Sequence, residues 1–182
     1  LERSDRFFEG FRQNAALSGN RFDGLTYAGR LESEPLGPLG DTVQDLKRGP
    51  FRIGMGASFF FSNGGTRDVL GAGGDVLIHS HGFHLLGEFI SNHSSPHTVP
   101  TQPTAQISTV QSLAAIGEIG YVIVKNRLGI NARIEWLDPN TSVKDEADSW
   151  LASGGLSYHV LHDFLKAQLD FIIHQLGDLK YY

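Results

Sequence analysis

The stretch that decides the fold is Leu128–Trp136, LGINARIEW, in which apolar residues alternate with small, polar or charged ones. Its even positions are apolar: Leu128, Ile130, Ala132, Ile134 and Trp136. Its odd positions are Gly129, Asn131, Arg133 and Glu135. Successive side chains of a β-strand point to opposite faces of a sheet, so this stretch predicts a strand with one apolar and one charged face.

Two-faced segments of this kind, each roughly ten residues long, recur through most of the chain. The other predicted strands are Leu25–Glu34, Phe51–Ser62, Leu70–His79, Phe83–Asn92, Leu113–Val124, Trp150–Leu161 and Phe164–His174, with the end of a further strand at Arg6–Arg12. Helical patterns are nearly absent, and Thr42–Lys47 is the best short candidate for a helix.

The connections between these segments alternate in length. Three are short enough to be hairpin turns: Ser80–Gly82, Lys125–Arg127 and His162–Asp163. Two are long and polar, Ser94–Gln111 and Pro139–Asp148. A transmembrane β-barrel has short turns on its periplasmic side and longer outer loops, so the long segments are predicted to be outer loops. Leu36–Pro50 would then be an unusually long inner connection.

The composition agrees with a barrel better than with helices. Only 40% of the 182 residues are hydrophobic, and no run approaches the roughly 20 apolar residues that a membrane-spanning helix needs. The 22 glycines suit tightly turned, tilted strands. The chain has no cysteine, which excludes disulfides and thiolate metal sites, and its net charge of −5 argues against nucleic-acid binding.

The alternation assigns side chains to two faces of the predicted barrel. The side chains expected to face lipid are Leu128, Ile130, Ile134, Trp136, Trp150, Leu156, Tyr158, Leu169, Phe171 and Ile173. The side chains expected to line the interior are Arg30, Glu32, Arg52, Asp75, Glu88, Glu118, Asn131, Arg133, Glu135, Lys166, Gln168 and Asp170. Trp136 and Trp150 fall at the outer ends of their strands and Tyr121 near an inner end, where membrane barrels carry aromatic girdles.

The predicted fold class is therefore all-β, an antiparallel transmembrane β-barrel in the bacterial outer membrane, with residues 1–182 forming one barrel region. When strand direction is counted from the short turns, the first and the last strand both run outward, which gives nine strands. Bacterial single-chain barrels have even numbers of strands. We therefore expect further strands to complete the barrel. The alternative is a soluble antiparallel barrel or sandwich, whose apolar faces would pack on each other.

Several segments resemble the family of phosphate-selective porins O and P. The similar runs are YAGRLESEPLGPLG from Tyr27, FRIGMGASFFFSNGG from Phe51, GAGGDVLIHSHGFHLLGEF from Gly71, IGEIGYVIVKNRLGINARIEWLDPNTSVKDE from Ile116 and LASGGLSYHVLHDFLKAQLDF from Leu151. The most distinctive string contains Arg133, Glu135, Trp136 and Asp138–Asn140. The resemblance is to the later half of such proteins, and it implies an outer-membrane channel of about sixteen strands that assembles as a homotrimer.

The chain departs from that family in its predicted interior charges. Phosphate selectivity in the family is attributed to ladders of arginine and lysine, but acids outnumber bases among the interior residues named above. A confined ring of acids favours cations, so phosphate selectivity is not expected here.

Three motifs could indicate other chemistry. His79, His81 and His84 form a candidate metal site, since three imidazoles can hold zinc or copper. The candidate is weak, because in a hairpin His79 and His84 would face the lumen and His81 would lie in the turn. VLGAGG from Val69 is similar to a dinucleotide-binding loop, but the residues after it have strand periodicity rather than helix periodicity. Glu118 and Glu135 could form an acid–base pair, although charged pairs that line a wet lumen are the ordinary explanation.

The predicted function is passive diffusion of small hydrophilic solutes or ions through a porin-like channel, with no catalysis and no cofactor. The predicted partners are outer-membrane lipid and the solutes. The alternative is a structural barrel that sheathes or anchors a partner protein in the outer membrane. An outer-membrane enzyme is a more distant alternative.

Overall fold

The computed structural model describes residues 26–40, 42–64, 67–96, 109–142, 148–160 and 165–176. These residues form eight β-strands. The strands are β1 (Thr26–Ser33), β2 (Arg52–Gly64), β3 (Arg67–Ser80), β4 (Phe83–Pro96), β5 (Val110–Val124), β6 (Leu128–Asp138), β7 (Ser149–His159) and β8 (Lys166–Leu176). Among the described residues, no helix is long and apolar enough to cross a membrane.

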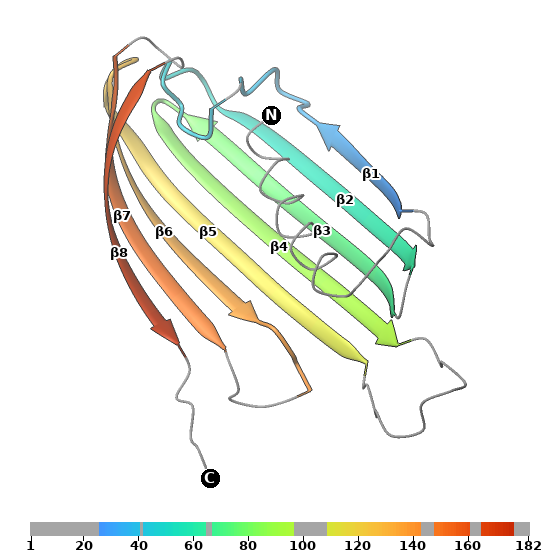
Figure 1. Cartoon of the computed structure of the whole chain (residues 1–182). Coiled ribbons are helices and arrows are strands. Elements are labelled where there is room, and N and C mark those ends of the chain that lie inside the picture. Colours follow the sequence, from blue (N-terminus) through green and yellow to red (C-terminus); the bar gives the residue numbers. More distant parts are fainter. Residues whose placement is uncertain are drawn as a thin grey trace.

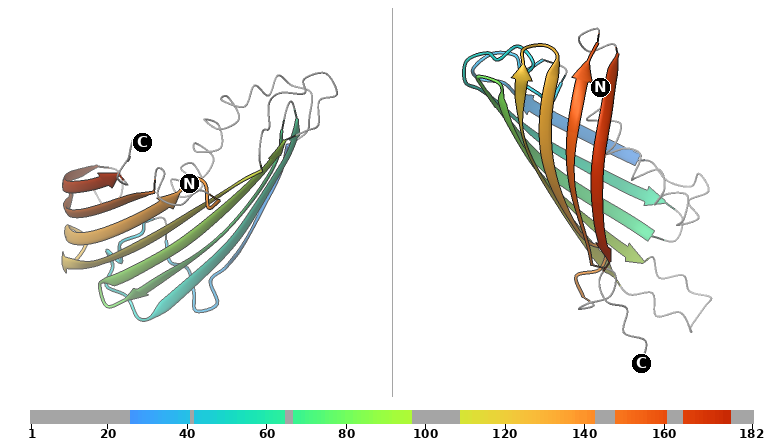
Figure 2. Two further views of the ribbon diagram at one scale, coloured as in Figure 1. Left: turned by 90° about the horizontal axis from the view of Figure 1, so that it is seen from below. Right: turned by 90° about the vertical axis from the view of Figure 1, so that its left-hand side faces the viewer.

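All eight strands belong to one antiparallel sheet in which each strand pairs with its neighbours in sequence, in the order β1 to β8 (Figure 1). The sheet is not closed, since β1 and β8 make no contacts with each other. Seen from below, the strands follow an arc with a concave and a convex side (Figure 2). The all-β antiparallel architecture predicted from the alternation is confirmed.

The register keeps the predicted faces together across the whole sheet. Glu118 pairs with Arg133, which pairs with Ser153, so their side chains lie on one face. Ile130 pairs with Leu156, which pairs with Leu169, and these side chains lie on the other face. Because a slip of one residue would exchange the two faces, the charged and apolar sets jointly fix this register.

Two hairpin turns have backbone conformations that close tight connections. His81 and Gly82 both have positive φ, 51° and 99°, as a two-residue type I′ turn requires. Asn126, in the three-residue turn between β5 and β6, has a φ of 59°. The register shifts beside this turn, between Val122 and Val124, which is a position where a β-bulge increases strand twist.

The observed strands differ from the predicted ones chiefly at their ends. β4 and β5 take Ser94–Pro96 and Val110–Gln111 from the predicted outer loop, so that boundary was wrong. Thr42–Lys47, the best short candidate for a helix, forms bends and a turn instead. Arg6–Arg12 and the turn at His162–Asp163 lie outside the described residues.

Few apolar side chains of the described sheet are buried. The fully or nearly buried apolar residues of the described chain include Leu39, Leu77 and Leu86, which form a small cluster with Val43 on the concave side. The convex side instead exposes large apolar side chains, among them Leu31 at 80%, Phe171 at 73% and Ile173 at 74%. The main hydrophobic surface of this protein therefore faces outward.

Candidate functional site: the concave face of the sheet

An arginine held between two acids lies on the concave face at the β1 side. Arg30 Nε contacts Glu32 Oε1 at 2.5 Å, and Arg30 Nη2 contacts Asp75 Oδ2 at 2.7 Å. Gly56 lies beneath this group, where a Cβ atom would meet both the guanidinium and Asp75. The absence of a side chain at Gly56 thus makes room for the ion pair, and the three charges together leave one net negative charge.

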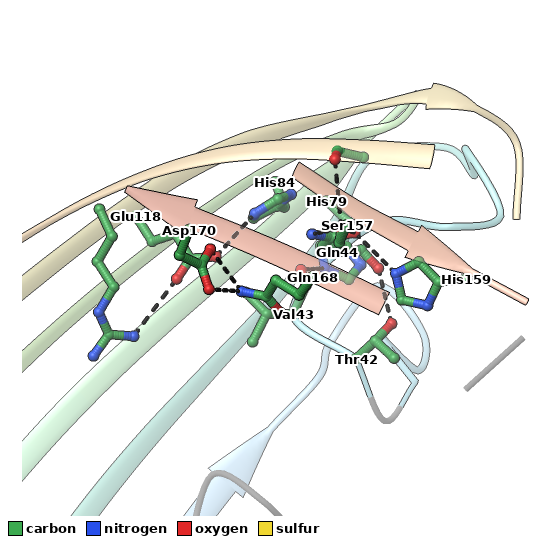
Figure 3. Close-up of polar contacts among 12 residues, drawn as sticks. Thr42, Val43, Gln44, His79, His84, Glu118, Ser157, His159, Gln168 and Asp170 are labelled. Carbon is green, nitrogen blue, oxygen red and sulfur yellow. Dashed lines mark hydrogen bonds and ion pairs between the residues drawn. The ribbon is translucent and has the colours of Figure 1, made fainter. Parts of the chain in front are cut away.

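A second acid–arginine–acid group lies on β5 and β6. Arg133 Nε contacts Glu135 Oε1 at 2.6 Å, and Arg133 Nη1 lies 3.5 Å from Glu118 Oε2. The other oxygen of Glu118 lies 3.3 Å from Nε2 of the fully buried His84 (Figure 3). Two carboxylates share one guanidinium here, so the formal charge of these three side chains is also negative.

Both groups border one cavity of about 670 Å³ on the concave side. Lys166, Gln168 and Asp170 of β8 also line it, and Gln168 Nε2 donates to both carboxylate oxygens of Asp170, at 2.8 and 2.7 Å. The cavity lining thus combines charges from β1, β3, β4, β5, β6 and β8. This arrangement can hold water and ions.

The convex face carries aromatic pairs near both ends of the strands. Trp136 and Trp150 are register partners with ring centroids 6.3 Å apart, at the end opposite the hairpin turns. Phe83 and Tyr121 pair at the turn end, with centroids 4.4 Å apart. Exposed aliphatic side chains lie between these two levels. Aromatic residues at both borders of an apolar band are typical of transmembrane barrels.

The alternation did not predict one component of the concave face, which we call the inner strap and define as Thr42–Gly49. Gln44 Nε2 donates to Ser157 Oγ at 2.8 Å, and Gln44 Oε1 lies 3.3 Å from His159 Nε2 (Figure 3). The carbonyl oxygen of Val43 contacts His79 Nε2 at 2.6 Å. The strap therefore crosses from β3 to β7 on the concave side.

Two leucines break the alternation where the strap packs on the concave face. Strict alternation would put a polar residue between Val76 and Ile78 and after Leu85, but Leu77 and Leu86 stand there. These two leucines are apolar side chains on the charged face, and the structure packs Leu39 and Val43 against them. A break in the alternation does not by itself mark such a cover, because Ile116 and Ile172 break the alternation on the same face.

The three histidines of the candidate metal site do not converge. His79 and His84 are register partners and lie buried on the concave face, whereas His81 lies exposed in the turn, with Nδ1 3.0 Å from Ser80 Oγ. Within the described ranges, no cluster of three or more potential ligands could hold a metal ion. Val69–Gly74 lies inside β3, so no phosphate-binding turn forms there.

The register places every residue predicted to line the interior on the concave face, and every residue predicted to face lipid on the convex face. Their roles toward a pore and toward lipid stay predictions. Comparison of the chain with protein-family models, with curated proteins and with solved structures finds no match. The resemblance to porins O and P stays a prediction as well.

Proposed function

We propose that this sheet is part of the wall of an outer-membrane β-barrel channel, with its convex face toward lipid and its concave face toward water. The observation that carries the proposal is the placement of the predicted charged interior residues on the concave face and of most exposed large apolar side chains on the convex face. In a soluble sandwich the apolar face would be covered, yet Phe171 and Ile173 on that face are about three-quarters exposed.

The strand lengths support the same proposal. A transmembrane β-strand needs about 9–11 tilted residues, and β2 to β8 each have at least 11. The aromatic pairs at the two ends of the apolar band support it further, because tyrosine and tryptophan favour the membrane–water interfaces.

The charges on the concave face favour cations over anions. Arg30 and Arg133 are each shared by two acids, so neither presents a free positive charge to a passing anion. A confined, water-filled passage with excess acids raises the local concentration of cations. We therefore propose passive diffusion of small hydrophilic solutes and ions with a mild preference for cations.

The direct test is reconstitution of the full-length protein into a planar bilayer with a potassium chloride gradient. We expect stable conductance steps and a reversal potential on the cation-selective side. Silence from protein shown to be folded would reject the channel. It would favour the alternative of a barrel that encloses a partner.

Glu118→Gln should reduce the cation preference, because it removes one negative charge from the concave face and keeps the side-chain shape. Asp138→Asn is the matched control, since Asp138 lies on the convex face of β6 by register. We expect the reversal potential to move toward zero in Glu118→Gln only. An equal shift in both variants would assign the preference to surface charge rather than to the concave face.

A further inference from the structure

The inner strap is fixed at the turn end of the sheet by one buried acid, Asp45, which is 1% exposed. Its Oδ1 accepts from Arg52 Nη2 at 2.8 Å and from the backbone N–H of Gly49 at 3.2 Å. Its Oδ2 accepts from the backbone N–H of Gly82 at 2.8 Å. Asp45 thus joins the strap to β2 and to the β3–β4 turn by charge-assisted hydrogen bonds.

Backbone hydrogen bonds extend the attachment along the rim of the sheet. The N–H of His81 donates to Gly49 at 2.7 Å, and the N–H of Asn126 donates to Leu46 at 2.9 Å. The strap is therefore held by the two hairpin turns that the structure describes at this end, as well as by β7 through Gln44. In Figure 1 it lies across the ends of the strands where these turns gather.

The sheet leaves space for the strap at a glycine. A Cβ atom on Gly129 would lie 2.6 Å from Gln44 Oε1, too close for any real side chain. Gln44 thus packs directly on the backbone of β6. Thr42, Val43 and Gln44 all line the cavity that Arg30, Glu118 and Lys166 border.

We propose that the inner strap narrows the turn-end mouth of the channel and that Gln44 is the strap residue that limits the size of what passes. This inference rests on the proposed channel function and deepens it. A solute that leaves the cavity toward the turn end meets the strap, whose hydrogen bonds to β3 and β7 resist displacement. The limiting side chain is a neutral amide, so selection by charge occurs at the acids and selection by size at the strap.

The test uses the absence of cysteine from the chain. Gln44→Cys supplies one thiol, and a methanethiosulfonate reagent that carries a quaternary ammonium group then adds bulk and positive charge at that point. We expect modification to lower the single-channel conductance of the full-length Gln44→Cys protein about twofold or more, relative to the same variant before modification, and to weaken its cation preference. A reagent that carries a sulfonate should lower the conductance but keep the cation preference.

Lys125→Cys is the matched control, because Lys125 is exposed in the β5–β6 turn at the same end and does not line the cavity. The cationic reagent restores its original charge, so the conductance should stay unchanged. Mass spectrometry reports whether each introduced thiol reacts. Unchanged conductance after complete modification of the Gln44→Cys variant, or failure of its thiol to react at all, would overturn the inference while the channel itself stands. Silence of the unsubstituted protein would instead reject the proposed function.

Discussion

Single residues on the two sides of this sheet face different environments. Ile134 is 51% exposed on the convex face, where water would offer an apolar side chain no favourable contact. Gln168 lies on the opposite face, beside Asp170 and the cavity. If the convex face meets lipid, the cost of an added charge must differ strongly between these two positions.

Ile134→Arg should destabilise the folded protein in a bilayer by about 2–4 kcal/mol, because Ile134 lies between the levels of the two aromatic pairs and the guanidinium would enter hydrocarbon. Gln168→Arg should be tolerated, since its side chain stays in water beside an acid. Urea titration of refolding into lipid vesicles measures both free energies. Similar costs at the two positions would favour a soluble fold.

Glycines on the concave face permit close contact between strands and large polar side chains. A Cβ atom on Gly120 would lie 2.5 Å from the backbone oxygen of Ile130 and would also overlap the ring of His84. On the same strand, a Cβ atom on Gly117 would meet only Ile134 Cγ2, at 3.6 Å. The two positions form a matched pair within β5.

Gly120→Ala should destabilise the protein by about 1–3 kcal/mol, because a backbone oxygen cannot move aside as the end of a flexible side chain can. Gly117→Ala should change the stability by much less, since its new methyl group makes an ordinary van der Waals contact. The same vesicle-refolding titration compares them. A larger loss for Gly117→Ala would contradict the close packing on the concave face.

At the scale of elements, the sequence predicted the strands and their faces well because alternation is a local pattern. It did not predict the inner strap, and Thr42–Lys47 was only the best short candidate for a helix. The strap owes its shape to partners far away in the chain, such as Ser157 for Gln44 and Gly82 for Asp45. Local periodicity contains no information on such contacts.

In the candidate site, too, the local pattern predicted the faces of side chains but not the contacts between distant residues. The alternation predicted that Arg30, Asp75, Glu118 and Arg133 share a face, because the strand register follows from the pattern. It did not predict that each arginine is held by two acids. That arrangement depends on which residues of neighbouring strands lie opposite each other, and the alternation fixes only the face. It also did not predict that Gln44 and Asp45, from a connection between strands, belong to this face.

At the scale of the whole molecule, the described sheet has two edges. β1 and β8 each pair with one neighbour, so half of their backbone groups have no partner within the sheet. An unpaired backbone group costs several kcal/mol in hydrocarbon. A membrane-embedded form therefore requires that both edges pair with further strands, as a closed barrel provides.

Hydrogen exchange of the full-length protein in lipid vesicles should reveal this closure. We expect slow exchange for the β8 amides that point away from β7, at a rate similar to that of amides paired between β7 and β8. Peptide-level mass spectrometry over Lys166–Gln175 counts the slowly exchanging amides of β8. If both edges of β8 are paired, nearly all amides in this peptide exchange slowly, and if only the β7 side is paired, only alternate amides do. Fast exchange along the outer edge of β8 would contradict a closed barrel.

The central claim, lipid on the convex face and water on the concave face, is tested most directly on β6. Single cysteines from Ile130 to Glu135, each carrying a nitroxide spin label in vesicle-reconstituted protein, report collision with oxygen, which is enriched in lipid, and with a water-soluble nickel chelate. We predict alternation with a period of two, in which Ile130, Ala132 and Ile134 favour oxygen and the positions between them favour the chelate. Equal access of the chelate to all six positions would contradict the account.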